Sequence, residues 1–274
     1  MNLCVLRRQN EGTLMKPIQS FNQSIQFLFT DIDDTITDEG QLHASAYAAL
    51  WSLAEKGIHI IPVTGRPAGW CEMIARFWPV QGIVGENGAF YFRYFKQKMH
   101  RHFFFNEDIR LENQKKLIIV KNEILSSVPD SALASDQFCR LFDLAIDFCE
   151  DVPALNTTEV QKIVRIFQKH GAQAKVSSIH VNGWFGNYDK LTMVLKYLEQ
   201  EWQISPEKAK IIAGFSGDSP NDEPMFEFFP HSFGVANINN FISTLKSPPT
   251  YVAAKRGGEG FVEITEQIIK FKTN

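Results

Sequence analysis

Short apolar runs and helical stretches alternate along the first 85 residues of the chain. Residues 25–30 and 58–63 are largely apolar runs followed by polar residues, as expected of strands buried on both faces of a parallel sheet. Residues 44–56 between them have a helical pattern, a second helix is expected over 67–77, and residues 80–84 suit a third strand. This order predicts a parallel sheet with right-handed crossovers.

The pattern changes after residue 85 and changes back at residue 189. The intervening block predicts an α+β unit with strands at 90–95, 99–105, 141–148, 174–178 and 180–185 and helices at 109–127 and 158–170. Alternation then resumes, with helices at 189–202, 223–228 and 239–245, a final helix, and strands at 210–215, 232–236 and 250–253.

The predicted fold class is therefore α/β, with a Rossmann-like parallel-sheet core interrupted by an inserted domain. The core is expected to comprise residues 25–85 and 188–274, and the inserted α+β cap residues 86–187. The mostly polar residues 1–24 are expected to form a loosely ordered N-terminal extension.

Composition narrows the class of protein. Of the 274 residues, 44% are hydrophobic and 22% charged, the balance of a soluble globular protein. The net charge of −3 gives no field that attracts nucleic acid or an anionic membrane, and no apolar run of about 18 residues predicts a transmembrane helix. The four cysteines are scattered and suit reduced thiols. We expect a cytoplasmic protein, a monomer or homodimer, whose partner is a small molecule.

Polar residues follow three of the predicted strands. Asp31 and Asp33 follow the first, the segment 64–66 (Thr-Gly-Arg) follows the second, and Asp218 with Asp222 follows the strand predicted at 210–215. Ligands bind at the carboxyl edge of an open parallel sheet, so these residues are expected to converge there. Alone, the pair of aspartates is equally consistent with a solvated turn.

These residue types suit phosphoryl transfer. A carboxylate can attack an anionic phosphate ester only when a cation neutralises the charge, and Asp31 with Asp218 offers the hard oxygen ligands that Mg²⁺ prefers. Asp33, two residues after the nucleophile, is positioned to protonate the leaving alkoxide and later to deprotonate the attacking water. Thr64 and the N–H of Gly65 are candidates to hold phosphate oxygens, and Lys190 to balance the remaining charge.

Four segments in this order resemble the motifs of the haloacid dehalogenase superfamily. They are 31–36 (Asp-Ile-Asp-Asp-Thr-Ile), 63–67 (Val-Thr-Gly-Arg-Pro), Lys190, and 217–222 (Gly-Asp-Ser-Pro-Asn-Asp). The insertion between the second and third motifs resembles the α/β cap of the Cof-type branch, which includes sucrose-phosphate, trehalose-phosphate and mannosyl-3-phosphoglycerate phosphatases. The resemblance covers residues 25–85 and 188–272; the cap is similar in position and pattern only.

The resemblance implies a role for each matched residue. Asp31 would be the nucleophile, Asp33 the acid/base that also offers its backbone carbonyl to Mg²⁺, and Lys190 the lysine of the third motif. Asp218 would be a metal ligand, and Asp222 an outer partner of the metal or of the lysine. Thr64 and Asn221 would contact the phosphate. Two positions depart from the family: Asp34 and Leu191 stand where relatives often have glycine.

Asp33 favours phosphoryl transfer over dehalogenation, because a dehalogenase has no leaving alkoxide for this residue to protonate. We expect a Mg²⁺-dependent phosphohydrolase that forms an aspartyl-phosphate on a small phosphorylated metabolite, with a phosphosugar favoured. The alternatives are a phosphosugar mutase similar to phosphomannomutase and a non-catalytic phosphometabolite-binding protein.

Three further features have two interpretations each. The segment 86–88 (Glu-Asn-Gly) suits a hinge turn or a substrate contact, and Arg66 suits a phosphate contact or an ion pair with a cap carboxylate. His180, Asn182 and Trp184 alternate along one strand, which suits either a sugar-binding face or a plain amphipathic strand.

Overall fold

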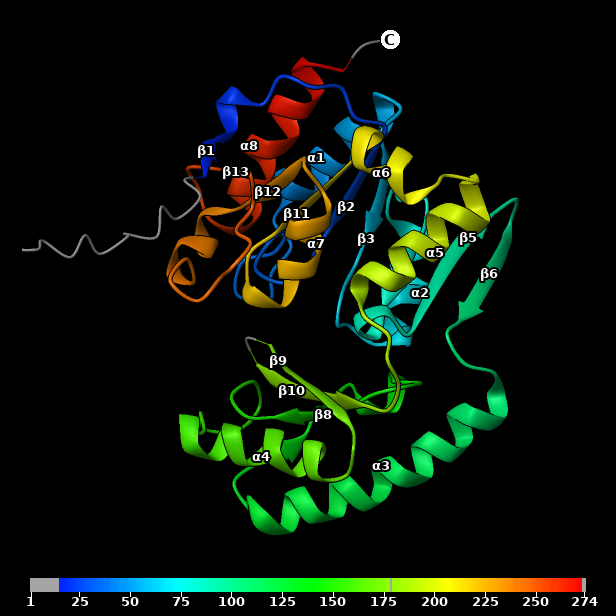
Figure 1. Ribbon diagram of the computed structural model, residues 1–274, viewed down its shortest axis with the longest axis vertical. Coiled ribbons are helices and arrows are strands. Elements are labelled where there is room, and N and C mark those ends of the chain that lie inside the picture. The colour runs from blue at the N-terminus through cyan, green and yellow to red at the C-terminus, as the bar shows by residue number, and fades with distance from the viewer. Residues whose placement is uncertain (1–14, 178, 273–274) are drawn as a thin grey trace, which may run out of the picture.

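The structure, a computed structural model, describes residues 15–177 and 179–272 and has two parts (Figure 1). The larger part contains a six-stranded sheet in the order β1-β13-β12-β11-β2-β3, in which every adjacent pair is parallel. Its strands are β1 (Lys16–Pro17), β2 (Phe27–Thr30), β3 (His59–Pro62), β11 (Ala213–Gly217), β12 (Ser232–Gly234) and β13 (Tyr251–Val252). The predicted α/β class with a parallel core is confirmed.

Helices cover both faces of this sheet. One face packs against α1 (Ala44–Glu55), α2 (Ala68–Phe77) and α8 (Gly257–Lys270), and the other against α5 (Lys190–Trp202), α6 (Pro206–Ile212) and α7 (Glu223–Phe228). Leu28 lies in the first cluster and its neighbours Phe27 and Phe29 lie in the second. Because both faces of β2 are covered, its first three residues are all apolar rather than alternating with polar ones.

The smaller part, at the bottom of Figure 1, is an antiparallel sheet backed by two helices. The sheet has the order β7-β8-β10-β9, and it packs on α3 and α4 through a separate apolar core that includes Val120, Ile146 and Phe167. The elements are α3 (Glu107–Ser127), β7 (Ala132–Leu133), β8 (Leu144–Asp147), α4 (Thr157–Lys169), β9 (Gln173–Val176) and β10 (His180–Trp184). The pattern of residues 158–170 predicts Thr157 or Thr158 as helix cap, but Asn156 caps α4 in a capping box with Glu159.

The first hairpin after residue 85 lies with the core rather than with the cap sheet. Strand β5 (Phe90–Phe95) pairs with both β4 (Ile83–Gly85) and β6 (Lys98–Phe103), and a bridge from Val63 to Val84 links this small sheet to the main one. Phe90 and Phe92 are buried in the same cluster as Leu28. We therefore propose that the cap unit comprises residues 106–187, since apolar burial ties the hairpin to the core.

Part of the predicted N-terminal extension belongs to the core. Residues 1–14 lie outside the described residues, but β1 adds a parallel edge strand beside β13. Ile18 and Phe21 are fully buried, and the Phe21 ring makes edge contacts with Phe233 and Tyr251. Two isolated apolar side chains in a polar stretch give too weak a periodicity to predict this packing.

Two predicted elements near the C-terminus differ from the observed ones. The apolar stretch 210–215 covers the end of helix α6 and the start of β11, because Ser205 caps a helix that begins with Pro206. The helix predicted at 239–245 is replaced by a short 3-10 helix, η5 (Ala236–Asn240), followed by turns. Among the described residues, no helix combines the length and the apolar character needed to cross a bilayer.

The buried position of Phe21 predicts that Phe21→Ala destabilises the core by about 3–5 kcal/mol, because it leaves a cavity between β13 and α8. Urea unfolding of the purified protein measures this change. Gln23→Ala is the matched control, since Gln23 is exposed two residues away and should change stability by less than about 0.5 kcal/mol. Equal stability of the two variants would show that residues 15–24 do not contribute to the core.

Candidate functional site

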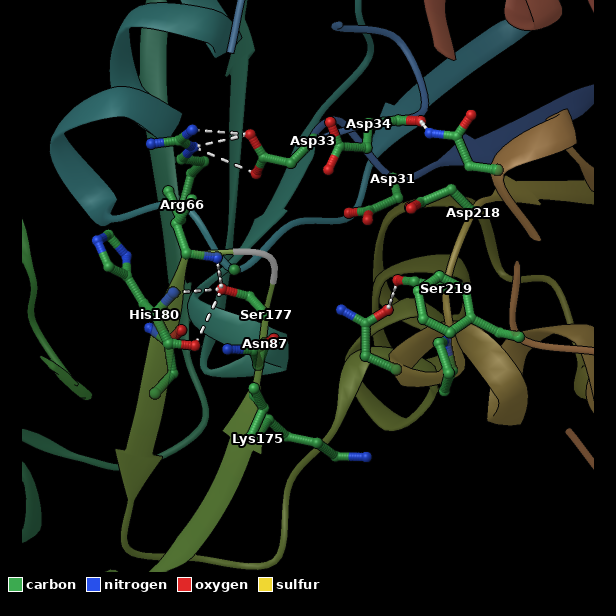
Figure 2. Close-up of a pocket in the computed structure, with 18 of the residues that line it drawn as sticks. Asp31, Asp33, Asp34, Arg66, Asn87, Lys175, Ser177, His180, Asp218 and Ser219 are labelled. Carbon is green, nitrogen blue, oxygen red and sulfur yellow. Dashed lines mark hydrogen bonds and ion pairs between the residues drawn. The ribbon is translucent and has the colours of Figure 1, made fainter. Parts of the chain in front are cut away.

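The carboxyl ends of the parallel strands open into a cavity of about 540 Å³ between the core and the cap (Figure 2). Asp31 follows β2 directly, and Asp218 follows β11. Both line this cavity together with Gly65, Arg66 and Asn221. The predicted site residues from three separate strands therefore meet at one sheet edge, as expected from the topology.

Lys190 is the centre of a buried ion-pair network. It is the first residue of α5, whose preceding residue Asp189 caps the helix by accepting from the N–H of Thr192. The Lys190 Nζ lies 3.0 Å from Asp31 Oδ1 and 2.7 Å from Asp222 Oδ1. Burial alone would lower the pKa of Lys190, but these two carboxylates outweigh it and raise the pKa above its usual value. The ammonium is therefore fixed in its charged form.

The carboxylates beside Lys190 carry more charge than the lysine compensates. One oxygen of each of Asp31, Asp218 and Asp222 lies within 4.8 Å of the others. Burial raises the pKa of Asp31 to about 7 against the opposing pull of Lys190, with Asp222 and Asp33 raising it further. Burial and the neighbouring Asp222 and Asp31 also raise the pKa of Asp218 well above its usual range. When all three are ionised, the net charge with Lys190 is −3 + 1 = −2.

This set of donors fits a divalent cation. Carboxylate oxygens are hard ligands, and a Mg²⁺ ion would cancel the residual charge of −2 without further protein groups. Burial and the neighbouring carboxylates raise the pKa values of Asp31 and Asp218, and a cation bound between them would favour their ionised forms. The carboxylate of Asp222 is already engaged, because its Oδ1 meets Lys190 and its Oδ2 accepts from the N–H of Asp218 at 3.2 Å.

The turn after β11 explains why the fourth motif begins with glycine. A Cβ on Gly217 would lie 2.4 Å from Asp222 Oδ2, so a larger residue would displace the carboxylate that holds Lys190. Asp218 is oriented from the first motif, since Thr35 Oγ1 donates to Asp218 Oδ1 at 3.1 Å. The two motifs are thus joined by side-chain contacts, among them that of Thr35, which the sequence spacing alone does not predict.

The backbone at Asp34 is left-handed, with φ of 56°. This conformation is the one that glycine adopts without strain, and aspartate is among the residues that tolerate it. Two contacts hold the turn: the Asp34 N–H donates to Thr37 Oγ1 at 3.2 Å, and Asn237 Nδ2 donates to the Asp34 carbonyl at 2.9 Å. Asn237 comes from η5 and had no recognisable signal in the sequence.

Arg66 forms an ion pair with Asp33 rather than with a cap carboxylate. Its Nε and Nη2 donate to the Asp33 carboxylate at 3.0 and 2.8 Å (Figure 2). Its guanidinium lies over the ring of Trp70. Burial would lower the pKa of Arg66, but Asp33 raises it. The predicted acid/base group is therefore turned away from the cluster of Asp31, Asp218 and Asp222 and toward Arg66.

The remaining predicted phosphate contacts lie at the same sheet edge. The buried Thr64 hydroxyl accepts from the N–H of Arg66 at 3.0 Å, and Gly65 lines the cavity close to the Asn87 amide. Asn221 lies at the cavity wall with its Oδ1 accepting from the Ser219 hydroxyl. Thr64 itself is fully buried, whereas Gly65 and Asn221 line the cavity.

The cap supplies the opposite wall of the cavity. Lys175, Ser177 and His180 face the aspartates across the gap in Figure 2, and Asn182 lines the same cavity. His180 pairs with Glu150 at 2.9 Å, and Asn182 donates to Asp143. Trp184, predicted on the same strand face, lines a neighbouring cavity of about 290 Å³. The alternation of these residues along β10 thus places two of the three at the main cavity.

The turn Glu86–Gly88 joins core and cap, a role that its hinge-like sequence only partly predicts. Both Glu86 and Asn87 have left-handed φ values, 42° and 57°. The buried Glu86 carboxylate accepts from the N–H of Ala68 in the core and from three consecutive N–H groups of the cap, those of Leu141, Phe142 and Asp143, at 2.6–3.1 Å. Asn87, the next residue, lines the cavity.

Comparison with known proteins agrees with this geometry. A family model described as haloacid dehalogenase-like hydrolase matches residues 28–127. The crystal structure of the protein Thermoplasma acidophilum 0175 is similar to this one, with a TM-score of 0.69 and 19% sequence identity. The match covers 90% of this chain and 99% of that one. No curated protein sequence matches the chain.

Two further solved structures carry names of phosphatases. The sucrose-phosphatase of Synechocystis sp. PCC6803, in complex with sucrose and phosphate, has a TM-score of 0.61 and 15% identity, covering 90% of this chain and 98% of its own. A trehalose-6-phosphate phosphatase related protein has a TM-score of 0.57 and 16% identity, covering 89% and 96%. The predicted resemblance to the haloacid dehalogenase superfamily is confirmed: the chain has the core-and-cap fold of these hydrolases.

Glu86 makes the stability of this junction depend on pH. Burial raises the pKa of Glu86 from 4.5 to about 8, with Asp143 adding to the effect and Arg140 opposing it. The folded state therefore holds a proton that the unfolded state releases near pH 4.5, so the stabilisation is complete below pH 4.5 and is lost as pH rises to about 8. As pH rises from 4.5 to about 8, we expect the free energy of unfolding of the wild type to fall by a few kcal/mol relative to that of Glu86→Gln.

Urea unfolding of both proteins at pH 5, 6.5 and 8 measures the effect. The Gln variant also changes hydrogen bonds to the cap, but that contribution is constant with pH, so only the slope of the difference reports the Glu86 proton. A difference that stays constant from pH 5 to 8 would contradict the raised pKa.

Proposed function

We propose that the protein is a Mg²⁺-dependent phosphatase that hydrolyses a small phosphorylated metabolite through an aspartyl-phosphate on Asp31. The observation that carries this proposal is the position of Asp31: a buried carboxylate at the cavity floor, 3.0 Å from the Lys190 ammonium and beside Asp218. A carboxylate in this setting is held by a cation yet faces a space large enough for a substrate. The family match and the phosphatase names of two structural neighbours support the same reaction class.

The reaction follows from the residues that surround Asp31. A carboxylate oxygen of Asp31 attacks phosphorus, and the bond from phosphorus to the ester oxygen breaks as the Asp31–phosphorus bond forms. The Thr64 hydroxyl and the N–H of Gly65 hold phosphate oxygens while Lys190 compensates the charge on the nucleophile. Bound Mg²⁺, held by Asp31 and Asp218, supplies electrostatic stabilisation of the phosphoryl group.

Asp33 moves the protons. It donates one to the leaving alkoxide and then accepts one from the water that hydrolyses the aspartyl-phosphate, so the carboxyl group is restored at the end of the cycle. In the structure, the Asp33 carboxylate forms an ion pair with Arg66. A substrate must therefore draw the guanidinium away or turn the Asp33 side chain before the carboxyl can reach the ester oxygen, which couples substrate binding to general acid catalysis.

A phosphosugar is the substrate class that the cavity suits best. The cap wall presents Lys175, His180 and Asn182, which offer hydrogen bonds to hydroxyl groups, and the core adds the amide of Asn87. The volume of about 540 Å³ is in the range of small-molecule sites. The cytoplasmic location and the oligomeric state stay predictions.

Replacing the nucleophile tests the proposal directly. We expect Asp31→Asn to lower kcat for a small aryl phosphate by at least about a thousandfold, because an amide is not a nucleophile at phosphorus. Circular dichroism establishes that the variant is folded, and Asp130→Asn, an exposed carboxylate of the cap, is the control that should keep full activity. Retained hydrolysis in Asp31→Asn would overturn the assignment of the nucleophile.

A panel of phosphorylated sugars with Mg²⁺ then separates the alternatives. Release of inorganic phosphate is the expected result. Transfer to a sugar without free phosphate would identify a mutase, and binding without turnover would identify a phosphometabolite-binding protein.

The acidic cluster predicts that Mg²⁺ stabilises the fold. Saturation at about 100 times Kd adds about 2.7 kcal/mol, equivalent to a rise in Tm of several degrees for a chain of this size. Asp218→Asn removes a ligand and should abolish most of the shift, whereas Asp130→Asn should keep it. Thermal unfolding at constant ionic strength, with K⁺ replacing Mg²⁺ in the reference sample, makes the measurement; an unchanged Tm in wild type would contradict the metal site.

A further inference from the structure

The cap contacts the core through a segment in addition to its two chain connections. The segment 136–143, which precedes β8, lies against the phosphate-binding loop 64–66 of the core. The contact is made by Arg140, whose Nη1 donates to the carbonyl of Gly65 at 3.1 Å. Arg140 is nearly fully buried, with 8% of its surface exposed, and so the bond is shielded from water.

The Arg140 guanidinium is fixed on two sides by carboxylates of its own segment. Nε and Nη2 form a fork with Asp136 at 3.0 and 3.2 Å, and Nη1 donates to both oxygens of Asp143. Burial would lower the pKa of Arg140, but Asp143 and Asp136 raise it above its usual value. A planar guanidinium held in this way has no freedom to turn from Gly65.

Glu86 fixes the position of this segment relative to the core. Its carboxylate accepts from the three N–H groups that follow Arg140 and from the N–H of Ala68, in the first turn of α2. The same turn holds the phosphate-binding loop through its backbone: the N–H of Glu86 donates to the Arg66 carbonyl, and the N–H of Asn87 donates to the Thr64 carbonyl. The three consecutive carbonyls of the loop are thus all bonded, the outer two by the core and the middle one by the cap.

The middle bond controls the hydroxyl that is proposed to bind phosphate. The Gly65 carbonyl and the Arg66 N–H belong to one planar peptide, so fixing the carbonyl also fixes the N–H. That N–H donates to Thr64 Oγ1 at 3.0 Å. Arg140 therefore acts on Thr64 through a single peptide unit, although no hydrogen bond joins the two side chains in the described structure.

We propose that Arg140 is a positioning residue for the phosphate-binding loop and that Glu86 holds it in place, so that the cap completes the phosphate site of the core. The proposal rests on the proposed phosphatase function, because it assigns Thr64–Arg66 to phosphate. The proposal implies that the cap is anchored at this loop. A change in the position of the cap on the core would then also change the conformation of the loop.

The test compares Arg140→Met with Arg110→Met, a matched variant at the same junction. Arg110 lies over the rings of Phe103 and Phe142 and makes no contact with the loop 64–66 in the described structure. We expect Arg140→Met to raise the inhibition constant of inorganic phosphate and the KM for a small aryl phosphate by about tenfold, whereas Arg110→Met leaves both within twofold. Arg140→Lys should not restore the wild-type values, because an ammonium cannot form the fork.

Hydrogen exchange gives a readout that does not depend on activity. The amide of Arg66 should exchange at least tenfold faster in Arg140→Met than in wild type or Arg110→Met, since its peptide is no longer held. If Arg140→Met does not fold, Asp136→Asn is measured instead, because it loosens one side of the fork. We then expect changes of about threefold in the phosphate inhibition constant and in the Arg66 exchange rate.

The outcomes separate the two proposals. Wild type without hydrolysis or phosphate binding would overturn the phosphatase, while faster exchange at Arg66 would still support the positioning role. An active wild type whose Arg140→Met variant keeps the phosphate inhibition constant and the Arg66 exchange rate within twofold would overturn the positioning role alone.

Discussion

The ion pairs of Lys190 are the interaction on which the candidate site depends. A buried ammonium and its carboxylates are costly to desolvate, and they persist only because each is compensated by the other. Lys190 draws Asp31 from the first motif and Asp222 from the fourth to one point, and Asp222 in turn holds the backbone of Asp218. The negative charge left over is what makes the same cluster suited to a divalent cation.

The parallel sheet supplies the geometry for this network. Strands β2 and β11 are adjacent and parallel with Thr30 opposite Ser216, so Asp31 and Asp218 leave the sheet within one residue of each other. Apart from the buried hydroxyls of Thr30 and Ser216, which bond to each other, the side chains of these two strands are apolar, and the candidate site lies in the residues that follow them. Packing therefore stabilises the core without constraining which residues form the site.

The cap contributes more than a cover over the cavity. Its strands β9 and β10 provide the far wall, and the segment before β8 is bonded to the core through Glu86 and the Gly65 carbonyl. Two neighbouring residues of one turn have different tasks: Glu86 binds the cap, and Asn87 faces the cavity. The same few hydrogen bonds therefore join the cap, which walls the cavity, to Glu86 and to the loop 64–66 of the core.

The sequence by itself determined the alternating core, the interruption by a cap, the strand-end residues Asp31, Thr64 and Asp218, and Lys190 at the start of a helix, because apolar runs and the motifs beside them are local signals. The tertiary structure decided which partners these residues have. Nothing near Arg140 distinguishes it from a solvated surface arginine, and its contact with Gly65 spans 75 residues. The ion pair of Arg66 with Asp33, the packing of Phe21 and the hairpin β5–β6 against the core also arise only when distant segments meet, since hydrogen bonds and burial depend on neighbours that the local pattern does not contain.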